Sequence, residues 1–337
     1  MTPVFVDVDT GVDDALALLY LLASPEADVV GIASTGGNVH VEQVCANNLG
    51  LLDLCRIASV PVSRGISGTL SGPMRPPSRV HGPRGLGYAE LPPTARQLTD
   101  YDAATAWARA ARAFPGELVG VATGPLTNLA LALRAEPALP TLLRRLVIMG
   151  GSYDHRGNTT AVAEWNISVD PQAAAEVLAA WAAGGGRPPI LCGLDLTRTV
   201  AMTPDHLARL AAAAGSTTTV MSTRDERGTR STASNPVIRL IEDAMRFYLE
   251  AYQDKGHGFQ AHLHDPLAAA VALDPRLVTT RPARVEVELT GILTRGMTVT
   301  DWSPSREHNA LIGVQVDAAA LFDRFIERVG PFARRLG

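Results

Sequence analysis

The stretch 3-PVFVDVDTGVDDALALLYLLA-23 decides how the fold of this chain begins. Valines alternate with Phe5, Asp7 and Asp9, and this period of two predicts a buried strand that ends near Asp9. A Thr-Gly turn follows, and the apolar run at 15–23 consists mostly of good helix formers before a Ser-Pro pair stops it. The sequence therefore predicts a strand, a tight turn and a core helix.

Four carboxylates surround this predicted turn. Asp13 and Asp14 fall in the first helical turn, where the helix dipole favours acids, so they could simply cap the helix. Asp7 and Asp9 need another explanation, because carboxylates on an apolar strand are costly to bury unless they are paired, hydrogen-bonded or bound to a cation. Asp9, Asp13 and Asp14 offer hard oxygen ligands at short range, a set that suits Ca²⁺ or Mg²⁺.

Strand-like and helix-like segments alternate along most of the chain. The clearest are predicted helices at 103–113, 126–133 and 171–183 and predicted strands at 117–122, 146–149 and 189–194. This alternation predicts an α/β fold with a mostly parallel central sheet and helices on both faces. The tail predicts three further β segments and a closing helix, which would form a small additional β element. We expect residues 1–337 to form a single domain.

Two regions interrupt the regular pattern. Residues 65–94 are rich in Gly, Pro and Ser, and residues 223–263 contain a polar break and a second loop, so both are candidate lids over a site. In open α/β sheets ligands bind outside the carboxyl ends of the strands. Asp9, Thr123 and Met149 all lie at the ends of predicted strands, so the sequence places the site at that edge.

Composition narrows the class of partner. The formal net charge of −4 gives no basic footprint for nucleic acid or an anionic membrane, so a small-molecule substrate is expected. The 46% hydrophobic content supports a large core. The three cysteines lie in apolar stretches of the sequence, which predicts free buried thiols in a reducing compartment. With a strand at the very start and no long uncharged apolar run, a cytoplasmic location is expected.

Six motifs, in order along nearly the whole chain, together resemble the nucleoside hydrolases of the inosine–uridine type. They are DVDTGVDD at 7–14, GN at 37–38, HGPRGLG at 81–87, TGPLTN at 123–128, AEWN at 163–166 and HDP at 264–266. The resemblance implies a Rossmann-like α/β fold, a tightly held Ca²⁺ and hydrolysis of the N-glycosidic bond of ribonucleosides. It also implies a homodimer or homotetramer.

The resemblance implies a metal site. Asp9, Asp14, the main-chain carbonyl of Thr123 and Asp265 would bind Ca²⁺, within the six to eight oxygen ligands usual for that ion. Asp9 would also act as the general base for a metal-activated water that attacks C1′ of the ribose.

The same resemblance implies contacts to the ribose and to the base. The ribose contacts would be Asp13, Asn38, the Met149 main chain, Asn158, Glu164, Trp165 and Asn166. His81 and His264 would handle the departing base, because an imidazole near its ordinary pKa can neutralise it. Simpler interpretations remain open: Asn38 as a turn residue, Glu164 and Asn166 on a solvated hairpin arm, Trp165 as a core residue and His81 as an exposed loop histidine.

Two features depart from the family pattern or resist comparison with it. Thr10 stands where the family commonly has proline, which should keep the turn but removes a fixed φ. The region 223–260 is hard to compare, and Tyr248, Tyr252, Gln253 and His257 are possible base contacts there. The preference for purine or pyrimidine therefore stays open.

Two other functions were weighed. VFVDVDTG also fits the strand end of haloacid-dehalogenase-like phosphatases, with Asp7 as nucleophile, but a matching downstream lysine and acidic pair are not evident. The second alternative is a catalytically silent Ca²⁺-dependent protein that binds nucleosides or sugars.

Overall fold

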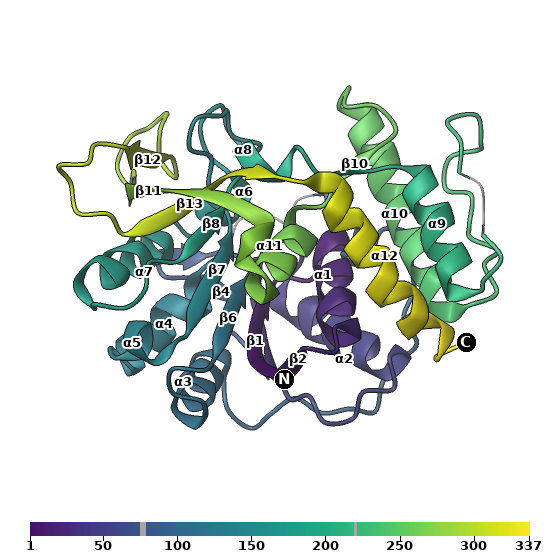
Figure 1. Cartoon of the computed structure of the whole chain (residues 1–337), viewed down its shortest axis with the longest axis horizontal. Helices are drawn as coiled ribbons and strands as arrows, with labels where there is room; N and C mark the ends of the chain where they lie inside the picture. Colours follow the sequence, from purple (N-terminus) through teal and green to yellow (C-terminus); the bar gives the residue numbers. More distant parts are fainter. Residues whose placement is uncertain (75–78, 219–220) are drawn as a thin grey trace.

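A mostly parallel sheet forms the centre of the fold (Figure 1). The computed structural model describes residues 1–74, 79–218 and 221–337, and within these ranges nine strands belong to this sheet. In chain order they are β1 (Thr2–Val8), β2 (Ala27–Ser34), β3 (Val62–Arg64), β6 (Val119–Ala122), β7 (Arg145–Met149), β8 (Ile190–Cys192), β11 (Val278–Val287), β12 (Thr298–Asp301) and β13 (Ala310–Val316).

Strand order shows where the parallel part ends. The sheet runs β12-β11-β13-β8-β7-β6-β1-β2-β3. All neighbours from β13 to β3 are parallel, whereas β11 pairs antiparallel with both β13 and β12. The predicted mostly parallel sheet and its small additional β element are confirmed.

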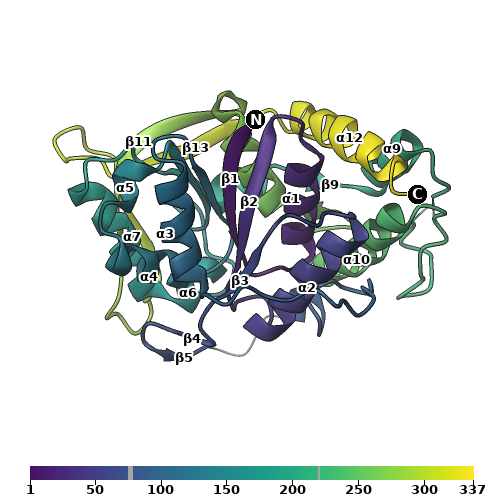
Figure 2. The same ribbon diagram turned by 90° about the horizontal axis from the view of Figure 1, so that it is seen from below.

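Helices cover both faces of the sheet, as Figure 2 shows with the strands between the two groups. One face carries α1 (Val12–Ala23), α2 (Val41–Leu54), α9 (Pro204–Ala214), α10 (Pro236–Asp254), α11 (His264–Leu273) and α12 (Ala318–Arg334). The other face carries α3 (Ala103–Ala113), α4 (Thr127–Ala135), α5 (Leu139–Leu142) and α7 (Pro171–Ala183).

The period-two pattern of β1 explains the two hydrophobic cores. Val4, Val6 and Val8 pack into the cluster that contains α1, and Phe5 packs into the opposite cluster, with its ring centroid 4.6 Å from that of Trp107. Alternate side chains of a strand point to opposite faces, so one short sequence supplies both cores.

One local prediction was wrong. Residues 158–167 resemble a hairpin arm in sequence, but Glu164 is the N-cap of the short helix α6 (Trp165–Val169), and its side chain accepts from the amides of Asn166 and Ile167. The polar alternation therefore reflects a helix cap and not a strand.

The two candidate lid regions contain regular elements. Region 65–94 contains β4 (Gly68–Thr69), β5 (Gly72–Pro73) and the 3₁₀ turn η1 (Arg79–His81), while its residues 75–78 lie outside the described residues. Region 223–263 contains the whole of α10 and the short strand β10 (Ala261–His262), which pairs with β9 (Ala201–Met202). The remaining short elements are α8 (Leu194–Thr197) and η2 (Pro275–Leu277).

The expectation of free buried thiols is confirmed. The three cysteines are free and buried. In the described part of the chain, no helix combines the length and the apolarity that crossing a membrane requires.

Candidate functional site

A cavity of about 410 Å³ opens at the carboxyl ends of β1, β6 and β7. Its lining brings together residues that lie far apart in sequence, as expected for an open α/β sheet. The predicted site residues that line it are Asp13, Asn38, His81, Thr123, Met149, Asn158, Glu164, Trp165, Asn166, His264 and Asp265. The two remaining predicted residues, Asp9 and Asp14, are fully buried.

Three carboxylates converge at the floor of this cavity. One oxygen each from Asp13, Asp14 and Asp265 lies within 4.8 Å of the other two. Asp13 and Asp14 occupy the first turn of α1, and Asp265 occupies the first turn of α11. The N-termini of α1 and α11 therefore place these carboxylates close together, where the helix dipoles lower the free-energy cost of negative charge.

Asp9 approaches the same cluster from the end of β1. Its carboxylate accepts hydrogen bonds from the Asn38 amide (2.7 Å) and from Asn38 Nδ2 (3.2 Å). A Cβ on Gly37 would lie 2.1 Å from Asp9 Oδ2, so only glycine allows the backbone this close. The Gly-Asn pair after β2 is therefore a specific partner of Asp9.

Burial and mutual repulsion disfavour ionisation of these acids. Burial is the largest cause that raises the pKa of Asp13 to about 8, and neighbouring charges add to it. The pKa values of Asp9, Asp14 and Asp265 are also raised, again chiefly by burial. Among the described residues no Lys or Arg pairs with any of the four. A divalent cation would relieve both effects.

The donor set fits a hard cation. Asp13 Oδ1 is buried and has no hydrogen-bond partner in the structure, which leaves an acceptor free at the cluster. Carboxylate and carbonyl oxygens are the ligands of Ca²⁺ and Mg²⁺, and no thiol or imidazole belongs to the three-carboxylate group.

The Thr123 loop closes another side of the cluster. The Thr123 hydroxyl donates to Asp14 Oδ1 (2.7 Å), and the Thr123 carbonyl accepts from Asn166 Nδ2 (2.6 Å). Asn166 Nδ2 also lies 3.2 Å from the Met149 carbonyl. The side-chain amide of Asn166, in the first turn of α6, thus connects this helix to the chain after β6 and to the end of β7.

Glu164 and Trp165 lie beside that amide. Glu164 is buried, and it accepts from the amides of Gly151 (3.1 Å), Asn166 (2.9 Å) and Ile167 (3.1 Å) while burial raises its pKa. Asn158 Oδ1 accepts from the Trp165 amide (2.9 Å). Trp165 Nε1 is buried without a partner, and the residue lines the cavity, so it is not a core tryptophan.

His81 and His264 also line the cavity, and His81 lies beside the carboxylate cluster. His81 Nδ1 accepts from the Val12 amide (3.1 Å) and lies 3.7 Å from Asp13 Oδ1. His264 Nδ1 contacts the Thr197 hydroxyl (2.7 Å), and its Nε2 contacts the Tyr252 hydroxyl (2.9 Å). Burial is the main cause that lowers the pKa of His81 to about 3 and that of His264 well below its ordinary value. Both imidazoles are therefore neutral near pH 7.

An aromatic wall extends from these histidines. The ring centroids of His81 and Tyr248 are 5.1 Å apart, those of Tyr248 and Tyr252 4.9 Å, and those of Tyr252 and His262 4.9 Å. Such a wall suits a flat heterocycle. Of the possible base contacts, Tyr248, Tyr252 and His257 line this cavity, whereas Gln253 lines a different one.

Sequence reasoning missed several lining residues. They are Val80, His155, Arg156, Gly157, Thr159, Leu194, Arg198, Lys255 and His262. Arg198 follows Thr197, the partner of His264, and its Nη1 lies 3.0 Å from His155 Nδ1. No local pattern marks these residues, because their common feature is a place in the cavity lining, which only tertiary packing creates.

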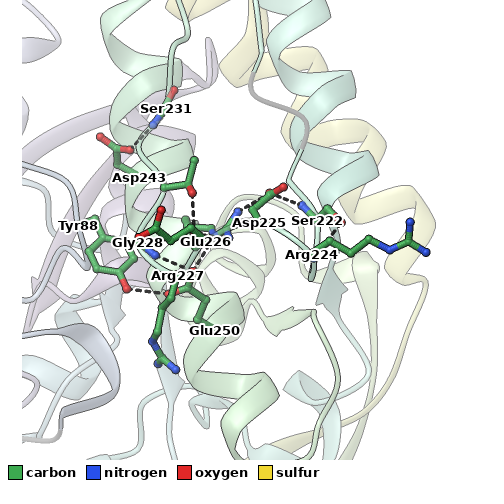
Figure 3. Close-up of polar contacts among 12 residues, drawn as sticks. Tyr88, Ser222, Arg224, Asp225, Glu226, Arg227, Gly228, Ser231, Asp243 and Glu250 are labelled. Carbon is green, nitrogen blue, oxygen red and sulfur yellow. Dashed lines mark hydrogen bonds and ion pairs between the residues drawn. The ribbon is translucent and has the colours of Figure 1, made fainter.

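A buried polar network connects helix α10 to Tyr88, which lies in the same region, 65–94, as His81. Glu250 accepts from the Tyr88 hydroxyl (2.7 Å) and the Gly228 amide (3.1 Å), as Figure 3 shows, and from Arg246 Nε (2.6 Å). Arg246 also donates to Asp225 (2.7 Å). Arg246 and Glu250 are only 2% and 5% exposed, so this is an ion pair largely removed from water.

The network lies on the back of the helix. Residues two positions apart point to different sides of a helix, so Arg246 and Glu250 face away from Tyr248 and Tyr252. The two tyrosines face the cavity. The Arg246–Glu250 ion pair therefore helps to determine the position of the aromatic wall relative to Tyr88.

Asp7 lies behind the site. Its oxygens accept from Trp107 Nε1 (2.7 Å) and Asn128 Nδ2 (3.0 Å), and burial raises its pKa to about 7. Both donors belong to α3 and α4, which cover the face of the sheet opposite α1, and Asp7 is not among the residues that line the cavity, which counts against a phosphatase nucleophile at this position.

Comparisons with known proteins agree with this geometry. The model of the family described as inosine-uridine preferring nucleoside hydrolase matches residues 4–323. A pyrimidine-specific ribonucleoside hydrolase of Citrobacter koseri is 36% identical over 334 residues, which cover 98% of this chain and 99% of that protein.

Solved structures give the same result. A purine-preferring ribonucleoside hydrolase from Gardnerella vaginalis superposes with a TM-score of 0.87 at 31% identity, covering 99% of both chains. A plant nucleoside hydrolase superposes with a TM-score of 0.85 at 28% identity, covering 98% of this chain and 99% of that one. The similar proteins thus include both a pyrimidine-specific and a purine-preferring enzyme.

Proposed function

Because this chain belongs to the inosine-uridine preferring nucleoside hydrolase family, and so is a ribonucleoside hydrolase, we propose that it cleaves the N-glycosidic bond of ribonucleosides with the help of Ca²⁺. The products are ribose and the free base. The observation that carries the proposal is the convergence of Asp13, Asp14 and Asp265 at the floor of a cavity with an aromatic wall.

Asp9, Asp14, the Thr123 carbonyl and Asp265 would hold the ion, with Asp13 adjacent. When bound, a divalent cation lowers the pKa of a water and gathers oxygen ligands. The hard, all-oxygen donor set favours Ca²⁺, which tolerates irregular coordination better than Mg²⁺ does.

Asp9 is the general base of the proposed reaction. Its two hydrogen bonds from Asn38 fix its orientation, so a proton can pass from the attacking water to a carboxylate that is already positioned. Water attacks C1′ directly as the bond to the base breaks through an oxocarbenium-like transition state.

The remaining residues orient the ribose. Asp13 Oδ1, which has no hydrogen-bond partner among the described residues, accepts from a ribose hydroxyl. Asn38, whose Nδ2 donates to the neighbouring Asp14, also lines the cavity. Asn158, Glu164 and Asn166 clamp the ribose, with the Met149 main chain near the 5′-hydroxyl. Trp165 packs against the sugar through its ring.

His81 and His264 contact the departing base. Because both are neutral near pH 7, their first contribution is hydrogen bonding to the base. His264 is oriented by Thr197 and Tyr252, one at each ring nitrogen. By the family resemblance we also propose a homodimer or homotetramer in the cytoplasm.

The decisive experiment measures ribose release from uridine, cytidine, inosine and adenosine, with metal analysis of the same preparation. Release of reducing sugar together with roughly one Ca²⁺ per chain is expected. Binding of nucleosides without ribose release would instead identify a catalytically silent binding protein and would overturn the proposal.

A further inference from the structure

The His81 imidazole is attached to the first turn of α1. Its Nδ1 accepts from the Val12 amide at 3.1 Å, and Val12 is the first residue of that helix. The first amides of a helix have no partners within the helix, so the imidazole satisfies one of them. In the neutral ring the proton then resides on Nε2, which leaves an N–H for the departing base.

The segment that carries His81 is folded back on itself. The amide of Gly87 donates to the His81 carbonyl (2.9 Å), which closes the loop between these two residues. Within this loop, the amide of Gly85 donates to the Gly82 carbonyl (3.2 Å). The two hydrogen bonds make the loop a compact unit, so a contact that fixes Arg84, inside it, also fixes the position of His81.

Asn47 joins this loop to the turn between β1 and α1. Its Nδ2 donates to the Arg84 carbonyl (2.9 Å) and to the Thr10 carbonyl (3.1 Å). Its Oδ1 accepts from Gln43 Nε2 (2.9 Å), one turn earlier in α2, so the amide is held with its nitrogen toward both carbonyls. Asn47 is only 3% exposed and does not line the cavity. It therefore acts on the site only through what it holds.

The loop and the turn also pack directly against each other at Gly85. The φ of Gly85 is +82°, and a Cβ there would lie 2.8 Å from the Thr10 carbonyl oxygen and 3.0 Å from Asn47 Nδ2. Glycine allows this conformation and this close approach, whereas a side chain would force the loop and the turn apart. A hydrogen-bonded amide and a close backbone contact thus maintain the same interface.

We propose that Asn47 is a positioning residue for the reaction: it holds the His81 loop against the turn before α1 and so places the His81 Nε2–H beside the departing base. Without the two Asn47 donors, two main-chain carbonyls lose their partner, which favours separation of the loop from the turn. The inference rests on the proposed function and adds a residue outside the cavity on which departure of the base depends.

The test compares kcat/KM for uridine and for 4-nitrophenyl β-D-ribofuranoside, whose leaving group departs without a hydrogen-bond donor. Asn47→Leu keeps most of the side-chain volume and removes both donors. With uridine we expect kcat/KM to fall about 10- to 100-fold, the usual effect of a small misplacement of a catalytic group. With the nitrophenyl riboside it should stay near the wild-type value, because that reaction does not need His81.

A double-mutant cycle with His81→Ala shows whether Asn47 acts through the histidine. Once the imidazole is absent, its position no longer matters. Adding Asn47→Leu to His81→Ala should therefore cause little further loss with uridine, whereas independent residues would give additive losses.

A second variant and two further measurements do not depend on Asn47→Leu alone. Gly85→Ala pushes the loop from the turn while both Asn47 donors remain, and it should reproduce the selective loss with uridine. In both variants the Val12 amide should exchange faster with deuterium, because its acceptor is the His81 ring. Elemental analysis should find unchanged Ca²⁺ content, since the carboxylates stay in place.

Arg84→Ala is the matched control. It removes an exposed side chain that pairs with Glu90 but keeps the main-chain carbonyl that Asn47 contacts. Both substrates should be hydrolysed at the wild-type rate by this variant, and the exchange of the Val12 amide should not change.

The outcomes that would overturn the inference are distinct. Equal losses with both substrates in Asn47→Leu, or no loss with either, would deny Asn47 a positioning role, and so would additive losses in the double variant. Loss of Ca²⁺ would assign Asn47 to the metal-binding turn instead. If Asn47→Leu does not fold, Gly85→Ala decides by the same criteria. No ribose release from any nucleoside by the wild type would refute the hydrolase function itself.

Discussion

At the scale of single residues, Asp9 and Asp265 differ in what their oxygens already contact. Asp9 accepts two hydrogen bonds from Asn38, whereas the charge of Asp265 is surrounded by those of Asp9, Asp13 and Asp14. The first residue is oriented for proton transfer, and the second depends on a cation for its charge. Substitutions at the two positions should therefore have different consequences.

For Asp9→Asn we expect nucleoside binding to persist while kcat falls by about 10²–10⁴-fold, the usual contribution of a positioned general base. The amide keeps the size of the side chain and one oxygen for the Asn38 amide. Steady-state kinetics and calorimetric titration with uridine check this. A variant with nearly wild-type kcat would remove Asp9 from the role of base.

For Asp265→Ala we expect loss of bound metal and of substrate affinity together, because one of three converging carboxylates disappears. Elemental analysis after dialysis and a binding titration are the measurements. His308→Ala, at a residue that does not line the cavity, serves as control. Unchanged Ca²⁺ content in Asp265→Ala would count against its assignment as a ligand.

At the scale of elements, α10 is a helix with two functions on two sides. Tyr248 and Tyr252 line the cavity, while Arg246 and Glu250 form an ion pair on the other side of the helix. Glu250 also accepts a hydrogen bond from Tyr88 (Figure 3). The position of the aromatic wall thus depends on side chains that do not touch the cavity.

Glu250→Ala should destabilise the fold by on the order of 3 kcal/mol, because it leaves Arg246 buried with only Asp225 as a carboxylate partner. Tyr88→Phe removes a single hydrogen bond and should cost about 1 kcal/mol. Denaturant unfolding measures both. A Glu250→Ala protein as stable as the wild type would show that the pair contributes nothing to holding α10.

At the scale of the whole molecule, the buried acids make stability depend on pH and metal. The folded-state pKa of Asp13 is raised to about 8 and that of Asp7 to about 7, from 3.8. The buried histidines, whose pKa values are lowered, act in the opposite sense near pH 6.5, because they bind protons only in the unfolded state, and this contribution fades within about one unit above that pH. Between pH 6.5 and 8 the folded state then binds more protons than the unfolded state, so stability falls as pH rises.

We therefore expect the metal-free protein to unfold at a lower temperature at pH 8 than at pH 6.5. Added Ca²⁺ should raise the unfolding temperature more at pH 8, because its ligands must be deprotonated. Thermal unfolding with EDTA or Ca²⁺ at both values measures this. An unfolding temperature of the metal-free protein that rises with pH would contradict the expected linkage.

Local sequence determined the elements that carry the site. The period of two in β1, the apolar run of α1 and the turn between them follow from the order of residues in the first two dozen positions. The predicted helices 103–113 and 171–183 match α3 and α7, because their caps and apolar spacing are local signals. The six motifs also indicated the family, since each one retains a local backbone shape.

Tertiary structure alone decided which distant residues share the cavity. Arg198, Lys255 and His262 carry no local signature, and they reach the rim because α8, α10 and β10 end beside one another. The polar alternation around Glu164 predicts a hairpin arm, yet Glu164 caps α6, because alternation over a few residues fits either structure until the chain packs. The opening stretch therefore determined the acids and the turn, while long-range packing determined which distant groups line the rest of the cavity.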